Sequence, residues 1–124
     1  MKEEKFNLDF SNNLNYTLQN LKKAIDEASN LEDKIYLELS KNEIIEYLNC
    51  VYTNIKCWKN DYELKKYENI ANNYKNVNSI ISQLELCLAD YDKIFHMDGI
   101  SYSIFQIGKI LPNIIKGGDK NGRW

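Results

Sequence analysis

Apolar residues recur at alternating spacings of four and three along most of this chain, and no other feature constrains the fold as strongly. An α-helix has 3.6 residues per turn, so this spacing gathers the side chains into one stripe on one helix face. The stripes are Leu14, Leu18, Leu21, Ile25, Ala28, Leu31 and Ile35; then Ile44, Leu48, Val51, Ile55 and Trp58; then Leu64, Tyr67, Ala71, Tyr74, Val77, Ile81, Leu84, Leu88, Tyr91 and Phe95; and finally Ile100, Ile104, Ile107 and Leu111. The sequence therefore predicts an all-α protein, an antiparallel bundle of four to five helices.

Short polar segments predict where these helices begin. Ser11 or Asn12 can cap the first helix by accepting a hydrogen bond from a free backbone N–H group. Residues 29–32 and 40–43 both match the Ser-x-x-Glu capping box, so the chain can start a helix at either point. The second is favoured, because a regular apolar stripe follows it.

The long third stripe would make a helix of about 54 Å if residues 61–96 were continuous. Five asparagines crowd residues 69–78, and asparagine side chains compete with helical backbone bonding, so we expect a kink or short loop there. Asp98 and Gly99 predict a helix stop, and Pro112 is expected to end or kink the last helix. These boundaries give one helical domain over residues 1–116 and a tail over residues 117–124.

The composition indicates a cytoplasmic protein from a low-GC bacterium or its mobile elements. The 124 residues carry a net charge of −2, and 17 Asn, 15 Ile and 15 Lys against one Arg suggest an AT-rich gene. No segment reaches the ~18 apolar residues of a membrane span, and the charged N-terminal residues do not resemble a signal peptide. Cys50 and Cys57 lie two helical turns apart, too far for one disulfide, which with Cys87 predicts three free thiols.

Residues able to carry chemistry do not form a recognisable catalytic pattern. His96, the single histidine, follows Asp92 by four residues, which is explained by a favourable interaction at a helix end. Cys50 and Cys57 lie beside the second stripe, where a small buried apolar side chain is the usual explanation. We therefore expect no catalysis, no cofactor and no metal.

Charge is distributed unevenly over the C-terminal half. Glu85, Asp90, Asp92 and Asp98 against Lys93 give −3 over residues 85–98, whereas the residues after Gly99 sum to +3. The two regions can face each other inside one bundle. Alternatively, the acidic residues form a docking face for a basic partner, such as a nuclease or another nucleic-acid-handling enzyme.

Nine tyrosines and two tryptophans exceed the usual needs of a small helical core, and such residues anchor protein interfaces. Tyr62, Tyr67 and Tyr74 are the candidate anchors, with Glu85, Asp90, Asp92 and Asp98 as candidate docking residues. The sequence thus favours a non-catalytic protein-binding module, most specifically a small inhibitor such as a toxin-immunity or phage counter-defence protein. A homodimer or homo-oligomeric scaffold subunit is one alternative. A single-stranded nucleic-acid-binding module is the other, although acidic residues interrupt its lysines.

Overall fold

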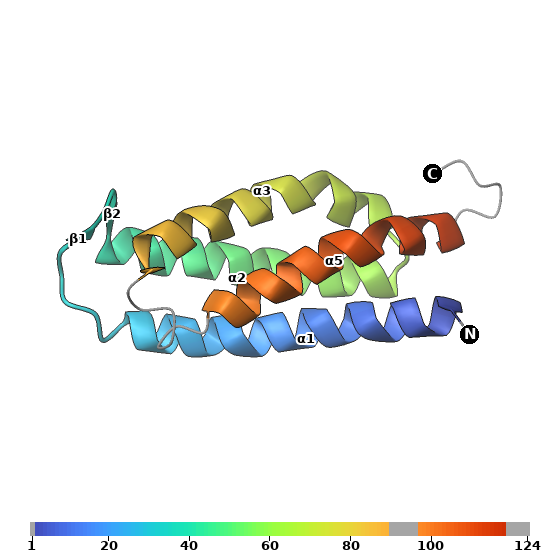
Figure 1. Ribbon diagram of the computed structural model, residues 1–124, viewed down its shortest axis with the longest axis horizontal. Coiled ribbons are helices and arrows are strands. Elements are labelled where there is room, and N and C mark those ends of the chain that lie inside the picture. The colour runs from blue at the N-terminus through green and yellow to red at the C-terminus, as the bar shows by residue number, and fades with distance from the viewer. Residues whose placement is uncertain (1, 90–96, 119–124) are drawn as a thin grey trace.

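The protein is an antiparallel bundle of α-helices, which confirms the predicted fold class (Figure 1). The computed structural model describes residues 2–89 and 97–118. Within them lie helices α1 (Lys2–Ala28), α2 (Lys41–Glu63), α3 (Tyr67–Cys87) and α5 (Met97–Gly118). Consecutive helices alternate in direction, and α1 packs on α2 and α5 while α3 packs on the same two.

A small β-hairpin joins α1 to α2, which the sequence analysis did not predict. Strands β1 (Ile35–Tyr36) and β2 (Leu39–Ser40) are antiparallel, with Ile35 opposite Ser40 and Tyr36 opposite Leu39. The hairpin turns at one end of the bundle, and the α2–α3 turn lies at the other (Figure 1). Ile35, predicted to continue the first apolar stripe, is instead exposed on this hairpin.

The capping box at the start of α2 is confirmed. The Glu43 backbone N–H donates to Ser40 Oγ over 3.2 Å, and the Ser40 backbone N–H donates to Glu43 Oε1 over 3.1 Å. The similar motif at residues 29–32 starts no helix, because α1 ends at Ala28 and the chain turns towards the hairpin.

The predicted start of the first helix was wrong, because α1 already begins at Lys2. Ser11 and Asn12 lie inside α1, where Asn12 faces solvent and Ser11 is half-buried. Phe10 explains why the helix does not begin at Ser11 or Asn12, since its side chain is fully buried and extends the apolar face of α1 beyond the predicted cap.

The kink or short loop predicted within residues 69–78 was wrong. The chain reverses at residues 64–66, where Lys65 has a φ of 60°, and α3 is helical throughout the asparagine-rich segment. Burial of Ile70 and Val77 against the core outweighs the weak helix propensity of asparagine. Asn73 is itself bonded to the neighbouring helix, its Nδ2 donating to Asn54 Oδ1 over 2.6 Å.

Two predicted helix ends in the C-terminal part were wrong. Asp98 and Gly99 lie in the first turn of α5 rather than at a stop. Pro112 does not end α5, which continues to Gly118 and so includes the first two residues of the predicted tail. The alternative that Pro112 kinks the helix stays a prediction. Residues 119–124 lie outside the described part of the chain.

The apolar stripes of α2 and α5 form the core as predicted, and those of α1 and α3 do so in part. Every predicted stripe residue of α2 and α5 is buried, whereas Leu64 is exposed, and Leu18, Ile25, Leu31, Tyr67, Ala71 and Tyr74 are only half-buried. Positions that the pattern omitted complete the core: Phe10, Thr17, Ala24, Ile70, Met97 and Ile114.

Gly108 allows the close approach of α5 to α3. A Cβ atom at this position would lie 2.9 Å from Cε2 of Tyr74 and still closer to its phenol oxygen. The Tyr74 ring cannot easily retreat, because it stacks on the buried Trp58 ring with centroids 6.2 Å apart. Gly108 is also the residue whose carbonyl loses its usual i+4 donor at Pro112.

We expect Gly108→Ala to lower the free energy of unfolding by about 1–3 kcal/mol, because the added methyl group overpacks the Tyr74 contact. Urea denaturation followed by circular dichroism measures this loss. Gly99→Ala is the control, and its loss should be smaller: the phenol oxygen of half-exposed Tyr16, 2.9 Å from the added Cβ, can turn into solvent, and the remaining contact is Asn20 Nδ2 at 3.2 Å. Equal losses for the two variants would contradict this packing of Tyr74.

Candidate docking surfaces

The three candidate tyrosines pack largely against the bundle itself. Tyr62 stacks on the buried Phe10 ring with centroids 4.8 Å apart, and its ring lies 5.9 Å from that of Tyr67. Tyr74 stacks on Trp58 one helix away. All three are half-buried, so the structure brings Tyr62 and Tyr67 together at the α2–α3 turn and places Tyr74 farther along α3.

Burial raises the pKa of all three phenols above the ordinary value of 10.0. For Tyr62 burial is the largest cause, a hydrogen bond with Ser11 acts in the opposite direction, and the neighbouring Tyr67 phenolate raises the pKa further. The folded protein therefore holds these protons to higher pH than the unfolded chain does.

This shift predicts how stability depends on pH. The contribution of the tyrosines is fully present below pH 10 and is lost as pH rises above 10, because the unfolded chain ionises first. Urea unfolding measured across this range should show the loss, and Tyr74→Phe should make it shallower. If the free energy of unfolding of Tyr74→Phe falls above pH 10 as steeply as that of wild type, the burial of the Tyr74 phenol is contradicted.

Only two of the four candidate acidic residues lie in the described part of the chain. Glu85 is half-buried near the end of α3, and Asp98 is exposed in the first turn of α5. Asp90 and Asp92 lie outside the described residues, as does the predicted pairing of Asp92 with His96. A docking face formed by all four carboxylates therefore stays a prediction.

The cysteines are free thiols, as predicted, but the expected burial of two of them was wrong. Cys50 and Cys57 are exposed on the outer face of α2, and Cys87 is half-buried near the end of α3. Cys57 borders a shallow, open depression with Lys56, Asn60 and Asp61. The inner face of α2 is filled by its larger apolar residues, which leaves the cysteines on the solvent side.

The hairpin carries two exposed apolar side chains. The spacing of apolar residues placed Ile35 in the core, whereas Leu37 was not considered. Ile35 is 64% exposed and Leu37 is 67% exposed, whereas Tyr36 and Leu39 are buried against the bundle. Leu37 has a φ of 58°, a left-handed conformation that a bulky side chain rarely adopts. The chain thus holds a large aliphatic side chain in solvent on a backbone that glycine would adopt more easily.

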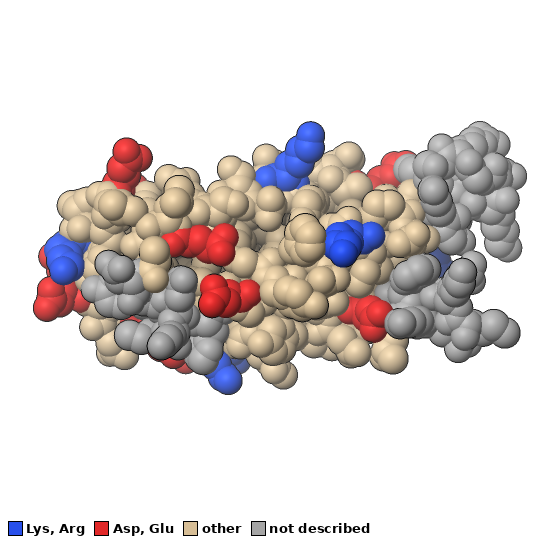
Figure 2. Space-filling model, viewed as in Figure 1, with Lys and Arg blue, Asp and Glu red and all other residues tan. Residues whose placement is uncertain are grey.

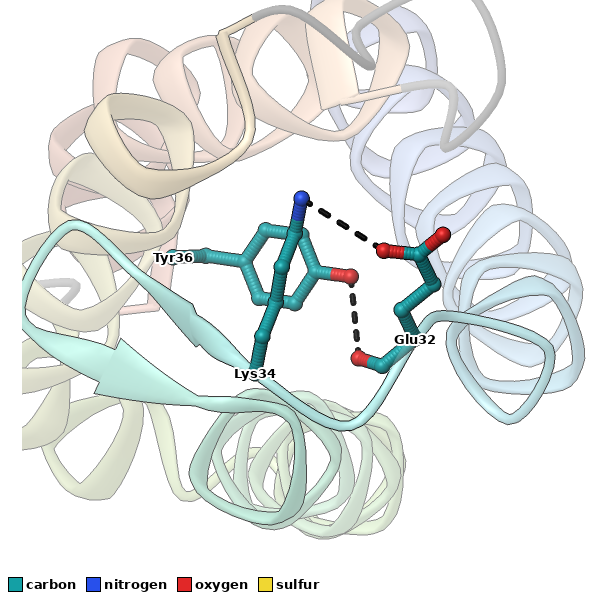
Figure 3. Close-up of polar contacts among 3 residues, drawn as sticks. All are labelled: Glu32, Lys34 and Tyr36. Atoms are coloured by element: carbon teal, nitrogen blue, oxygen red, sulfur yellow. Dashed lines mark hydrogen bonds and ion pairs between the residues drawn. The ribbon is translucent and has the colours of Figure 1, made fainter.

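Polar contacts fix the base of the hairpin (Figure 3). The Tyr36 hydroxyl donates to the Glu32 carbonyl oxygen over 3.0 Å, and Lys34 Nζ lies 3.6 Å from Glu32 Oε2. Lys34 Nζ also lies 5.2 Å from the centre of the Tyr36 ring, so one lysine contacts both neighbours. The exposed side chains therefore project from an anchored turn.

The same end of the bundle has an excess of acidic groups. Residues 31–43 contain four acidic side chains (Glu32, Asp33, Glu38 and Glu43) and two basic ones (Lys34 and Lys41), which gives −2. The last turns of α3 reach this end too and add Glu85 and the exposed Leu86 (Figure 1). Acidic and basic side chains stand out here in Figure 2, and most of the face over α5 is uncharged. We call the surface formed by two exposed apolar residues and the four acidic residues of segment 31–43 the hairpin end: Ile35, Leu37, Glu32, Asp33, Glu38 and Glu43.

Comparison of the chain with protein-family models, curated proteins and solved structures found no match. Within residues 2–89 and 97–118, no helix combines the length and apolar character needed to cross a membrane. In the same residues, no cluster of three or more His, Cys, Asp or Glu side chains is arranged to hold a metal ion.

Proposed function

We propose that the protein is a non-catalytic protein-binding module that inhibits its partner by covering a functional surface. In its most specific form it is a cytoplasmic toxin-immunity or phage counter-defence protein from a low-GC bacterium or its mobile elements. The observation that carries the proposal is the hairpin end, where Ile35 and Leu37 are exposed on an anchored turn. Large apolar side chains at a loop tip are typical anchors for a pocket on a partner protein.

The charge of the hairpin end supports a basic partner. Lys34 is paired with Glu32, and Asp33, Glu38 and Glu43 outnumber the remaining Lys41, so the surface around the apolar anchors keeps a net charge of −2. A nuclease or other nucleic-acid-handling enzyme exposes basic groups at its substrate site, and opposite charge speeds encounter with such a surface. Of the candidate docking residues, Glu85 and Asp98 add two more acidic side chains on the described part of the bundle, and Asp90 and Asp92 stay candidates from the sequence alone.

Two alternatives have less support. A single-stranded nucleic-acid-binding module needs open aromatic faces along a positively charged track. Trp58, Tyr62 and Tyr74 in the lysine- and tyrosine-rich segment are packed against other rings. Among the described residues of their helix face, the exposed rings of α5, Tyr102 and Phe105, have only Lys109 beside them, with Asp98 on the same face. Gel shifts at two salt concentrations would detect such binding. A homo-oligomeric scaffold subunit would instead form a stable assembly of several copies without a partner, even in dilute solution, which light scattering measures.

Leu37→Gly separates the docking role from folding. The left-handed backbone at Leu37 costs a bulky residue about 1–2 kcal/mol, which glycine avoids. Glycine also makes the unfolded chain more flexible, which lowers the free energy of unfolding by about 0.5–1 kcal/mol. The net effect should be a rise in the free energy of unfolding of about 0.5–1 kcal/mol. Removing the exposed side chain should nevertheless weaken partner binding about tenfold or more. Urea denaturation gives the first quantity, and calorimetry with the purified partner gives the second.

Lys65→Gly is the matched control, because Lys65 also has a positive φ and lies at the opposite end of the bundle. This variant should gain similar stability and keep full affinity. The partner is first purified from the native cell on the tagged wild-type chain, and its enzymatic activity is assayed with and without the protein. The proposal fails if no stoichiometric partner is recovered, if the partner stays fully active, or if Leu37→Gly binds as tightly as wild type.

A further inference from the structure

The solvent side of α5 carries a short stripe that neither the core nor the hairpin end uses. Asp98, Tyr102, Phe105 and Lys109 are all exposed and follow spacings of four, three and four, so they share one helix face. Tyr102 is 63% exposed and Phe105 is 56% exposed. Two neighbouring aromatic rings in solvent between an acidic and a basic residue are unusual for a surface that contacts only water.

The stripe is complementary to a second copy of itself that runs in the opposite direction. The midpoint between Asp98 and Lys109 falls between Ser103 and Ile104, and the midpoint between Tyr102 and Phe105 falls at the same place. In an antiparallel pair of identical helices related by a two-fold axis, residues equally distant from the axis face each other. One register therefore places Asp98 against Lys109 of a second copy and Tyr102 against Phe105 of that copy, twice by symmetry.

We propose that this stripe pairs two copies of the chain through antiparallel α5 helices. The occupant is a second copy because its charges match in sign and spacing, whereas a parallel arrangement would oppose Asp98 to Asp98 and Lys109 to Lys109. Within one chain Asp98 and Lys109 are about 16.5 Å apart along the helix, so they do not pair with each other.

Contacts within one chain hold side chains in or beside the stripe. Lys109 Nζ lies 5.3 Å from the centre of the Phe105 ring, so the cation already stands over the aromatic part of the stripe. On the α1 side, half-exposed Tyr16 brings its hydroxyl to 2.9 Å from the position that a Gly99 Cβ would occupy. A third aromatic ring thus borders the stripe.

The small size of the stripe predicts a weak dimer. Interfaces below about 1,200 Å² of total buried surface are typically transient, so we expect a dissociation constant of the order of 100 μM. The hairpin end is not part of this surface. The pairing therefore does not rest on the proposed inhibitory function, and either can fail without the other.

Charge reversal tests the register directly. Sedimentation equilibrium of the full chain, in reducing buffer and from about 10 μM to about 1 mM, should show a monomer–dimer equilibrium. Asp98→Lys creates two Lys–Lys pairs and Lys109→Asp creates two Asp–Asp pairs, so each should weaken the dimer about tenfold or more. The double variant Asp98→Lys/Lys109→Asp restores opposite charges and should recover affinity to within about threefold of wild type.

An equimolar mixture of the two single variants provides a second test. One chain then carries two lysines and the other two aspartates, so every cross pair is attractive, and a heterodimer should form where each variant alone stays monomeric. Glu46→Lys and Lys56→Asp are control reversals at exposed positions on α2 and should leave dimerisation unchanged. Thermal unfolding by circular dichroism checks that every variant is folded.

The inference is overturned if wild type remains monomeric at about 1 mM. It is equally overturned if a dimer forms but the single reversals do not weaken it more than the α2 controls do. Failure of both the double variant and the mixture to restore pairing would exclude the antiparallel register.

Discussion

Burial of one face of α5 between α1 and α3 is the interaction on which the rest of the bundle depends. Each fully buried isoleucine or leucine contributes about 1.5–3 kcal/mol, so a helix with several of them matches the whole net stability of a domain, about 5–15 kcal/mol. Gly99 and Gly108 let this face approach its neighbours closely. The residues that fill the space are Met97, Ile100, Ile104, Ile107, Leu111 and Ile114.

The sequence predicts those helices correctly that bury one continuous apolar face. The stripes of α2 and α5 are buried residue for residue, because each of these helices presents one continuous face to the core. Local signals failed where tertiary contacts outweigh them. Buried Phe10 extends α1 past its predicted cap, and buried Ile70 and Val77 keep the asparagine-rich segment helical. Asp98 and Gly99 resemble a stop, yet Gly99 serves as the point where α5 approaches Tyr16.

The candidate surfaces were harder to predict, because residue type does not reveal exposure. Tyr62, Tyr67 and Tyr74 are typical interface residues, but their rings fill gaps between helices that only the three-dimensional arrangement creates. Ile35 continues the spacing of the first stripe by chance, while the chain has already left the helix at Ala28. A β-branched and an aromatic residue side by side after a polar segment, Ile35 and Tyr36, were the available signal for a strand.

The most extensive packing in the described bundle joins α1 to α5, the first and last of its helices in chain order. During synthesis α1 leaves the ribosome well before α5 exists, so the part of its apolar face that packs on α5 has no partner while α2 and α3 are being made. Closing this contact joins two helices whose midpoints lie about ninety residues apart, and such non-local closure slows folding compared with bundles built from sequential neighbours. Until α5 is made, the apolar residues of α1 and α3 that pack on it stay uncovered, and uncovered apolar surface of this kind is what chaperones bind in unfinished proteins.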